Sequence, residues 1–574
     1  MPSVEPMNDL AVKSQLSGDF GLVWEDQPED MQQRLEKEIP VFASDLSLNV
    51  SSGLDNEVQH VLIEGDNLHA LHTLQATHRG LVDVIYADPP YNTGKEFVYN
   101  DKLIDLENSY RHSAWLSFMH KRLSLAKSLL APGGIIAISI DDNEHSRLRL
   151  LMEQIFGERN CLGDLSVVNY LAGRSDRAHF AIAHEYLLVF SNDSKLARIK
   201  GFALTSEQIA EYTESDELGR YKPETLRKRG ANSLREDAPS LFYPIFWNEE
   251  SNELSLDRKS DLDHEIIPLL ASGAEGNWRW GKDKFLESKN TELVVKITRG
   301  RPVVYVKQRL NPNDGEERLS KPKSVWLDPK YNSGAGTRLI KRMVKAEFTN
   351  PKPLEYIMDI IGMCVPNQIV LDFFAGSGTT LHAVAALNKT DGGKRRCILV
   401  TNNESDICVE VTQPRIRAAL TGDWLEGTNE RLPGDLQFYR TDFIQRKKNV
   451  DRMKSDLARH TVDLVTIREG ARPLSKVSKD FNVLQSESST IAVVTDPDVN
   501  QAEYERIARN LATDGKDLKA YLFTWSDHGV EPEISAQWPG WAVEPLPADM
   551  LAQLRRIVPD PDDLFKDFNR REGQ

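Results

Sequence analysis

The feature of this sequence that most restricts its fold is a repeated change from short apolar segments to longer helical ones. Apolar runs at 58–64, 81–87 and 135–142 are each followed, after a turn or loop, by a segment with helical periodicity. Strands that alternate with helices of this length are typical of a mostly parallel sheet with helices on both faces. The sequence therefore predicts an α/β fold with a doubly wound, mostly parallel sheet.

The alternation of predicted strands and helices returns at 345–440, and the regions before and after it differ in composition. The helix predicted at 109–130 is expected to end at the APGG turn that follows it. The predicted domains are an acidic helical segment (1–57), a first catalytic part (58–194), an inserted recognition domain rich in Arg, Lys, Pro, Asn and Trp (195–344), a second α/β part (345–440) and a small C-terminal α/β domain (441–574).

Length and charge limit the class of protein. A chain of 574 residues is too long for one ordinary core. A net charge of −16 disfavours a small basic nucleic-acid binder, but residues 1–60 carry a net −9 and residues 296–345 a net +9. Four cysteines without CxxC spacing predict neither disulfides nor a zinc site. With no apolar run of membrane-spanning length and no signal-like amino end, we expect a cytoplasmic protein.

A glycine turn follows the strand predicted at 368–374. In FFAGSGTT, Gly376 and Gly378 let the backbone turn tightly and approach a ligand. The GxGxxG pattern and the lysine of a phosphate loop are missing, whereas Glu404 stands where acids bind ribose hydroxyls. Lys352, between two prolines, could meet a ligand carboxylate. S-adenosylmethionine carries both groups; the alternative is an ordinary strand-to-helix turn.

The stretch DVIYADPPYNTG (83–94) ends a predicted strand with an acid, two prolines and a tyrosine. Because proline disfavours helical backbone in the residue before it, Asp88 and Pro89 are held extended at the strand's carboxyl end. Ligands of open α/β sheets bind there, so the Asp88 carboxylate and Pro89 carbonyl could accept hydrogen bonds from a planar NH2 group. Tyr91 offers a ring on which a base can stack. The alternative is a turn that merely caps the strand.

With these motifs identified, the chain resembles the amino-methyltransferases of DNA. DPPY at 88–91 looks like their catalytic motif and FAGSGTT at 374–380 like their cofactor motif, in the order of the β class. Segments such as IEGDNLHALHTLQ, ADPPYNTG, SIDDNE, AHEYLLVFS and FTNPKPLEYI are similar to the modification subunits of type III restriction systems. The resemblance covers most of residues 20–405.

The resemblance implies a class I, Rossmann-like methyltransferase that uses S-adenosylmethionine and no metal. An aspartate at the first motif position, where cytosine N4 enzymes often carry serine, favours N6 of a flipped adenine as the acceptor. The implied catalytic residues are Asp88, Pro89, Pro90 and Tyr91. The implied cofactor-binding residues are Asp66, Lys352, Asp372, Phe374, Ala375, Gly376, Gly378, Thr379 and Glu404.

The implied partner is duplex DNA, out of which the adenine must rotate. Basic clusters are the candidates for phosphate contact: Arg227, Lys228, Arg229, Arg338, Lys341 and Arg342. By the same resemblance, the C-terminal domain would support a homodimer, and a helicase-nuclease restriction subunit is a further expected partner.

Two other functions stay open at this point. Acid-Pro-Pro-aromatic turns also serve enzymes that methylate RNA, so RNA is an alternative substrate. A catalytically silent DNA-binding subunit that keeps S-adenosylmethionine as a structural ligand is a second alternative, which the intact Asp88 and Tyr91 disfavour.

Overall fold

The computed structural model describes ten stretches of the chain. These are residues 22–24, 29–54, 58–93, 110–173, 179–312, 317–364, 369–445, 450–496, 499–522 and 530–545. They divide into two units. The larger is formed by the chain before residue 200 and after residue 322, and the smaller by residues 200–322.

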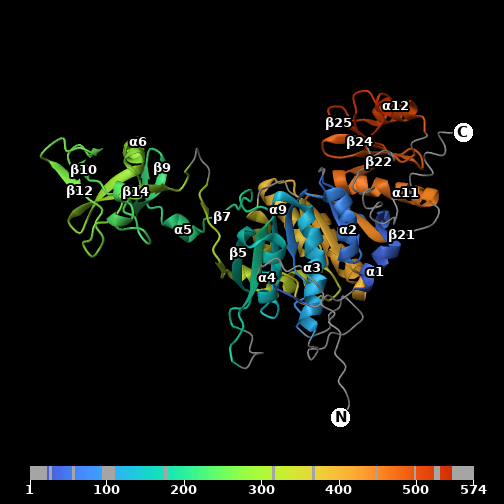
Figure 1. The fold of residues 1–574 in the computed structure, drawn as a ribbon, viewed down its shortest axis with the longest axis horizontal. Helices are drawn as coiled ribbons and strands as arrows, with labels where there is room; N and C mark the ends of the chain where they lie inside the picture. Colours follow the sequence, from blue (N-terminus) through green and yellow to red (C-terminus); the bar gives the residue numbers. More distant parts are fainter. Residues whose placement is uncertain are drawn as a thin grey trace, which may run out of the picture. The chain divides into compact units, whose positions relative to one another are not determined.

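A ten-stranded mixed sheet forms the centre of the larger unit (Figure 1). In spatial order its strands are β1 (Glu38–Ser44), β21 (Asp435–Gln445), β2 (Gln59–Glu64), β18 (Arg396–Thr401), β17 (Ile369–Asp372), β3 (Val82–Ala87), β4 (Leu130–Ile140), β6 (His184–Ser191), β5 (Cys161–Val168) and β16 (Val325–Trp326). From β21 to β4, neighbouring strands are parallel. The edge strand β1 is antiparallel to its neighbour β21, and β6 is antiparallel to both of its neighbours, β4 and β5. The parallel centre agrees with the predicted α/β fold.

Helices from the two halves of the chain form two groups beside this sheet. The first group is α2 (Asn67–His78), α3 (Arg111–Leu129) and α4 (His145–Phe156), and the second is α8 (Leu354–Gly362), α9 (Thr379–Asp391) and α10 (Gln413–Thr421). Within each group, helices that follow one another in the chain pack together. Their inner faces bury leucines such as Leu71, Leu123 and Leu151 completely, and each such side chain stabilises the fold by about 1.5–3 kcal/mol.

The register of two central strands fixes where the acid-Pro-Pro turn and the glycine turn begin. β17 and β3 are parallel neighbours, and Asp372 lies opposite Tyr86. The DPPY segment leaves β3 after Ala87, and the glycine turn leaves β17 after Asp372. Both segments therefore start at the same edge of the sheet, which is the edge where ligands of open α/β sheets bind.

Three details differ from the predicted secondary structure. Helix α3 ends at Leu129, within one residue of the predicted end, but the APGG segment after it is not a turn: it lies inside β4, where a side chain on Gly134 would lie 2.8 Å from the Val82 carbonyl oxygen. The region 1–57, predicted to be helical, contributes the edge strand β1 after a short helix, α1 (Asp30–Lys37). β21 crosses the domain boundary predicted at 440, because its pairing with β2 and β1 holds the whole strand in the central sheet.

The smaller unit has a core of its own. One sheet holds β13 (Leu293–Thr298), β14 (Arg301–Arg309), β9 (Gly219–Thr225) and β8 (Glu214–Asp216), and another holds β11 (Leu254–Ser255), β10 (Ile245–Asn248) and β12 (Asp263–Ile266). The two short strands β7 (Phe202–Ala203) and β15 (Leu319–Ser320) pair with each other. Helix α6 (Lys282–Glu292) adds Phe285 to a buried cluster that contains Leu226 and Trp278.

This unit is shorter than the predicted insert, 195–344. Helix α7 (Ser333–Met343) lies in the larger unit, where Ile340 and Met343 pack in one cluster with Val411 and Ala418. The prediction ended the insert too late because the basic composition of 323–344 resembles that of the insert, whereas the buried face of α7 belongs to the α/β body.

The C-terminal part of the larger unit forms a second, five-stranded sheet. Its strands are β22 (Arg472–Lys476), β23 (Phe481–Gln485), β24 (Ser489–Val494), β25 (Asp517–Leu522) and β26 (Ala542–Pro545), with helices α11 (Val450–Glu469) and α12 (Gln501–Leu511). Arg396 of β18 donates to the carbonyls of Ile467 and Arg468 and so caps the end of α11. Among the described residues, no helix combines the length and apolarity that crossing a membrane requires.

Candidate active site

A cavity of about 480 Å³ lies at the carboxyl edge of the central sheet. Both predicted motifs line it: Asp88, Pro89 and Pro90 come from the acid-Pro-Pro turn, and Phe374 and Gly376 come from the glycine turn. The remaining lining residues follow β18 or precede α8: Glu347, Phe348, Thr349, Thr401, Asn402, Glu404, Ser405, Ile407 and Val411. The fold thus brings the acid-Pro-Pro turn, the glycine turn and the predicted ribose acid into one cavity wall.

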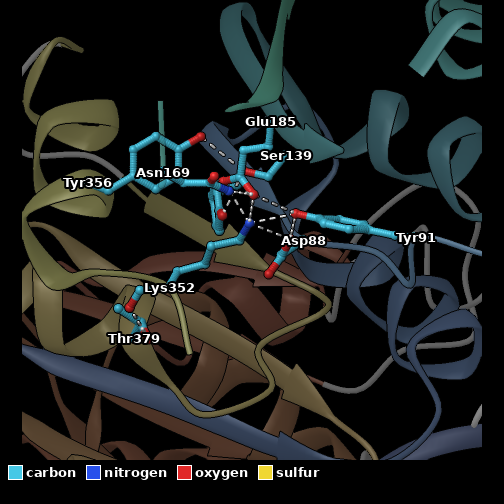
Figure 2. Close-up of polar contacts among 9 residues, drawn as sticks. Asp88, Tyr91, Ser139, Asn169, Glu185, Lys352, Tyr356 and Thr379 are labelled. Atoms are coloured by element: carbon cyan, nitrogen blue, oxygen red, sulfur yellow. Dashed lines mark hydrogen bonds and ion pairs between the residues drawn. The ribbon is translucent and has the colours of Figure 1, made fainter. Parts of the chain in front are cut away.

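Asp88 belongs to a cluster of four polar side chains (Figure 2). Tyr91 donates its hydroxyl hydrogen to Asp88 Oδ1 at 2.7 Å. Lys352 Nζ donates to the Tyr91 hydroxyl at 2.5 Å and to the two oxygens of Glu185 at 2.8 and 2.9 Å, and it lies 3.3 Å from Asp88 Oδ1. One ammonium group therefore ties two carboxylates and the tyrosine together.

Glu185 is the member of this cluster that the sequence motifs did not identify. It is buried near the start of β6, where Asn169 donates to its Oε2 at 3.1 Å. The signal was present in AHEYLLVFS, an acid at the start of an apolar strand. Beside the cluster, Ser139 lies within hydrogen-bond distance of the hydroxyls of Tyr86 and Tyr356 (Figure 2).

The surroundings of Asp88 shift its pKa in opposite directions. Burial raises the pKa of the Asp88 carboxyl, the ammonium of Lys352 lowers it, and the neighbouring Glu185 raises it again; the result is a pKa above the ordinary value. Burial alone would lower the pKa of Lys352, but the two acids raise it, so the lysine stays charged. Asp88 keeps 28% of its side chain exposed and can still meet a ligand in the cavity.

The backbone of the acid-Pro-Pro turn is held from α3 and α4. Trp115 Nε1 donates to the Pro90 carbonyl at 2.7 Å. Asn92 has a left-handed backbone (φ 54°), and its amide donates to the fully buried Glu144 at 2.5 Å, an oxygen that His112 Nδ1 also contacts at 2.5 Å. These contacts fix both ends of the segment that carries Tyr91.

The glycine turn has the left-handed backbone that its sequence predicts. Gly376 and Gly378 have φ values of 47° and 75°, which glycine adopts without strain. Thr412 donates to the Gly376 carbonyl at 2.5 Å. The buried Arg415 donates to Thr379 Oγ1 at 2.6 Å and to Ser377 Oγ at 3.0 Å, and so stabilises the turn from α10. Phe374 and Gly376 reach the cavity, while Thr379 is engaged with Arg415.

Asp372 stabilises the glycine turn through two hydrogen bonds. Its carboxylate accepts from the Phe374 backbone N–H at 2.9 Å and from the Thr380 hydroxyl at 2.5 Å, and the side chain is buried. Both carboxylate oxygens thus accept hydrogen bonds inside the turn, and direct cofactor contact by Asp372, which the resemblance implied, stays a prediction. Ala375, three residues further along the chain, is buried as well.

Burial raises the pKa of Asp372 from 3.8 to about 7. The folded chain therefore binds this proton more tightly than the unfolded chain, and the stability that the protonated form confers is lost as pH rises from about 4 to 7. We expect Asp372→Asn to remove this pH dependence. The free energy of unfolding of the variant, relative to that of the wild type, should therefore increase between pH 5 and pH 8, by roughly 1.4 kcal/mol per unit of pKa shift at most. Urea denaturation at both pH values measures it, with exposed Asp423→Asn as control; parallel profiles would contradict the expectation.

Two other predicted cofactor residues lie in different surroundings from those expected. Lys352 points at Glu185 and Tyr91, so a contact with a cofactor carboxylate does not fit its position. Asp66 caps α2 by accepting from Leu68 N–H and lies 3.5 Å from the buried Arg122; it is not among the residues that line the cavity. Glu404, by contrast, lines the cavity as predicted.

The predicted DNA-binding residues fall into both units. Arg227, Lys228 and Arg229 follow β9 in the smaller unit. Arg338, Lys341 and Arg342 are exposed on α7 in the larger unit, and Arg342 pairs with Glu426 at 3.0 Å. DNA contact by these six residues remains a prediction.

Comparisons with known proteins agree with this geometry. A family model described as DNA methylase matches residues 82–411, which is more than half of the chain. The chain is 36% identical to the type III restriction-modification enzyme EcoPI Mod subunit of Escherichia phage P1, over 60% of this chain and 58% of the relative, so it spans less than two thirds of that protein. It is 38% identical to the type II methyltransferase M.KpnI of Klebsiella pneumoniae, over 61% of this chain and 82% of the relative.

Among solved structures, the PvuII DNA methyltransferase (cytosine-N4-specific) matches with a TM-score of 0.29 and 11% identity, over 63% of this chain and 88% of that chain. The M1.HpyAVI–SAM complex matches with a TM-score of 0.27 and 14% identity, over 62% of this chain and 98% of that one.

Proposed function

This chain belongs to the DNA methylase family, and on that premise we propose that it transfers a methyl group from S-adenosylmethionine to N6 of an adenine in duplex DNA. One observation carries the proposal. The Asp88 carboxylate and the glycine turn at Gly376, which lie in opposite halves of the chain, line the same cavity. A methyl donor held by the turn would therefore meet an amine held by the acid.

The cavity suits S-adenosylmethionine by its size and its wall. Its volume of about 480 Å³ is within the range of small-molecule sites. Phe348 and Phe374 offer apolar rings, Glu404 offers a carboxylate for ribose hydroxyls, and a side chain on Gly376 would lie 3.5 Å from the Phe348 ring and narrow the space. When bound, the cofactor supplies an activated methyl group.

The residues of the chain itself would position and stabilise the amine. An exocyclic amine is a weak nucleophile, so the Asp88 carboxylate and the Pro89 carbonyl would hold it in line with the methyl group and stabilise the positive charge that grows on nitrogen. Lys352 and Tyr91 fix the Asp88 oxygen that does not serve the amine. The adenine must leave the base stack to reach this point, at a cost of a few kcal/mol.

We propose further that the chain acts as a modification subunit. The name of its phage P1 relative, a Mod subunit of a type III enzyme, supports this role. In such an arrangement a helicase-nuclease subunit would restrict unmodified DNA, and the C-terminal sheet would serve association into a homodimer.

Sequencing of genomic DNA tests the proposal. We expect a host free of its own methylation to acquire N6-methyladenine in one sequence context when it expresses this chain, read by single-molecule sequencing. A host expressing Asp88→Ala serves as control. If the DNA is unmodified and RNA of the same cells is methylated, the RNA alternative is favoured. If the DNA contains N4-methylcytosine, the acceptor is cytosine N4 and not adenine N6.

A further inference from the structure

The loop that joins β5 to β6 carries two large apolar side chains that are mostly exposed to solvent. Leu171 is 76% exposed and Phe180 is 85% exposed. Single exposed apolar residues are common on protein surfaces, but two such residues on one loop are a feature that invites a binding partner. In Figure 1 this loop, coloured teal, extends past the end of β5.

The two residues stand on two arms of the loop that run side by side. The backbone N–H groups of Asn169 and Tyr170 both donate to the Ala183 carbonyl, at 3.1 and 3.2 Å. Further out, a side chain on Gly173 would lie 2.7 Å from the Ala181 Cβ, so the arms approach each other there as well. Leu171 and Phe180 are therefore held on one short hairpin.

The base of this hairpin contacts the cluster of polar side chains around Asp88. Asn169, two residues before Leu171, donates to Glu185 at 3.1 Å, and Glu185 binds the ammonium of Lys352, which contacts Asp88 (Figure 2). β6 runs antiparallel to β4, so the hairpin leaves the sheet at the same edge as the acid-Pro-Pro turn. Any duplex that delivers a base to Asp88 must come close to this hairpin.

Resting on the proposed function, we propose that Leu171 and Phe180 form an apolar wedge that enters the base stack of duplex DNA next to the extruded adenine. Removing a base from the stack leaves apolar faces of its neighbours exposed, and apolar side chains that insert between base steps are a known means of covering them. The two residues extend from the edge of the sheet that carries Asp88, and this position favours a duplex that delivers a base to Asp88 over an apolar protein surface.

The test uses duplexes that contain the sequence found by genomic sequencing, in the full-length chain. In one duplex the target adenine is paired with thymine, and in the other it faces a mismatched base, which lowers the cost of extrusion. We expect the double variant Leu171→Ala/Phe180→Ala to methylate the paired duplex at least tenfold more slowly than the wild type. On the mismatched duplex we expect the two rates to lie within threefold of each other.

Leu150→Ala is the matched control, because Leu150 is also exposed (47%) but lies on α4. Its rates should equal those of the wild type on both duplexes. An unchanged rate of the double variant on the paired duplex, or an equal loss on both duplexes, would overturn the wedge. If the wild type methylates neither duplex, this result contradicts the proposed function itself, and the wedge proposal, which depends on that function, is refuted as well.

Discussion

Replacing Asp88 with asparagine should slow methyl transfer to duplex DNA by about 10²–10³-fold and leave cofactor binding intact. Asparagine keeps the shape of the side chain but replaces one acceptor oxygen by a donor and removes the charge that would stabilise the methylated nitrogen. Loss of one group aimed at a developing charge typically costs about 10²–10³ in rate. Tritium transfer from labelled S-adenosylmethionine measures the rate, and calorimetric titration measures the binding of the cofactor.

The structure indicates why the two measurements should separate. Asp88 accepts a hydrogen bond from Tyr91 and forms an ion pair with Lys352, and neither of these partners belongs to the glycine turn. Asp423→Asn, an exposed acid on β19 (Asp423–Trp424), supplies the control for a general effect of one lost charge. Transfer by Asp88→Asn at the wild-type rate would refute the catalytic assignment, whereas a loss of cofactor binding would place Asp88 in the cofactor site.

The position of the cavity could be predicted from the sequence because it depends on local patterns and one topological rule. DPPY and the glycine turn each follow an apolar strand, and parallel strands of an α/β sheet end at a common edge. Proline at 89 and 90 and glycine at 376 and 378 restrict the backbone by their own chemistry. The register of β3 and β17, by contrast, was not predictable from burial, because both strands are buried on both faces.

The partners of Asp88 could not be predicted because they depend on pairing between distant strands. Glu185 reaches the cluster only because β6 joins the sheet in the antiparallel direction, which periodicity does not specify. For Lys352, the flanking prolines indicated a fixed cation correctly, but sequence could not distinguish a cofactor carboxylate from the carboxylates of the protein. The hydrogen bonds of Asp372 inside the glycine turn could not be predicted for a related reason, since a motif position does not show which way a carboxylate faces.

The roles of Lys352 and Glu185 lead to opposite shifts in the pH dependence of methyl transfer. Transfer requires ionised Asp88, so the rate should fall as pH drops through the pKa of Asp88, which is raised in the folded chain. Lys352 lowers that pKa and Glu185 raises it. In Lys352→Met the acidic limb of the profile should therefore move to higher pH, and in Glu185→Gln it should move to lower pH.

Both variants should also transfer more slowly at their optimum, by about 10–100-fold, because Asp88 and Tyr91 lose a partner that orients them. The measurement is kcat/KM for a cognate duplex between pH 5.5 and 9, with Glu426→Gln, which alters an exposed ion pair with Arg342, as control. If the Lys352–Glu185 pair has only a structural role, both variants should be slower, but the acidic limb of the pH profile should stay in place or move in the same direction in both. Opposite displacements would instead mean that the pair sets the charge of Asp88, because only then does the sign of the removed group decide the direction.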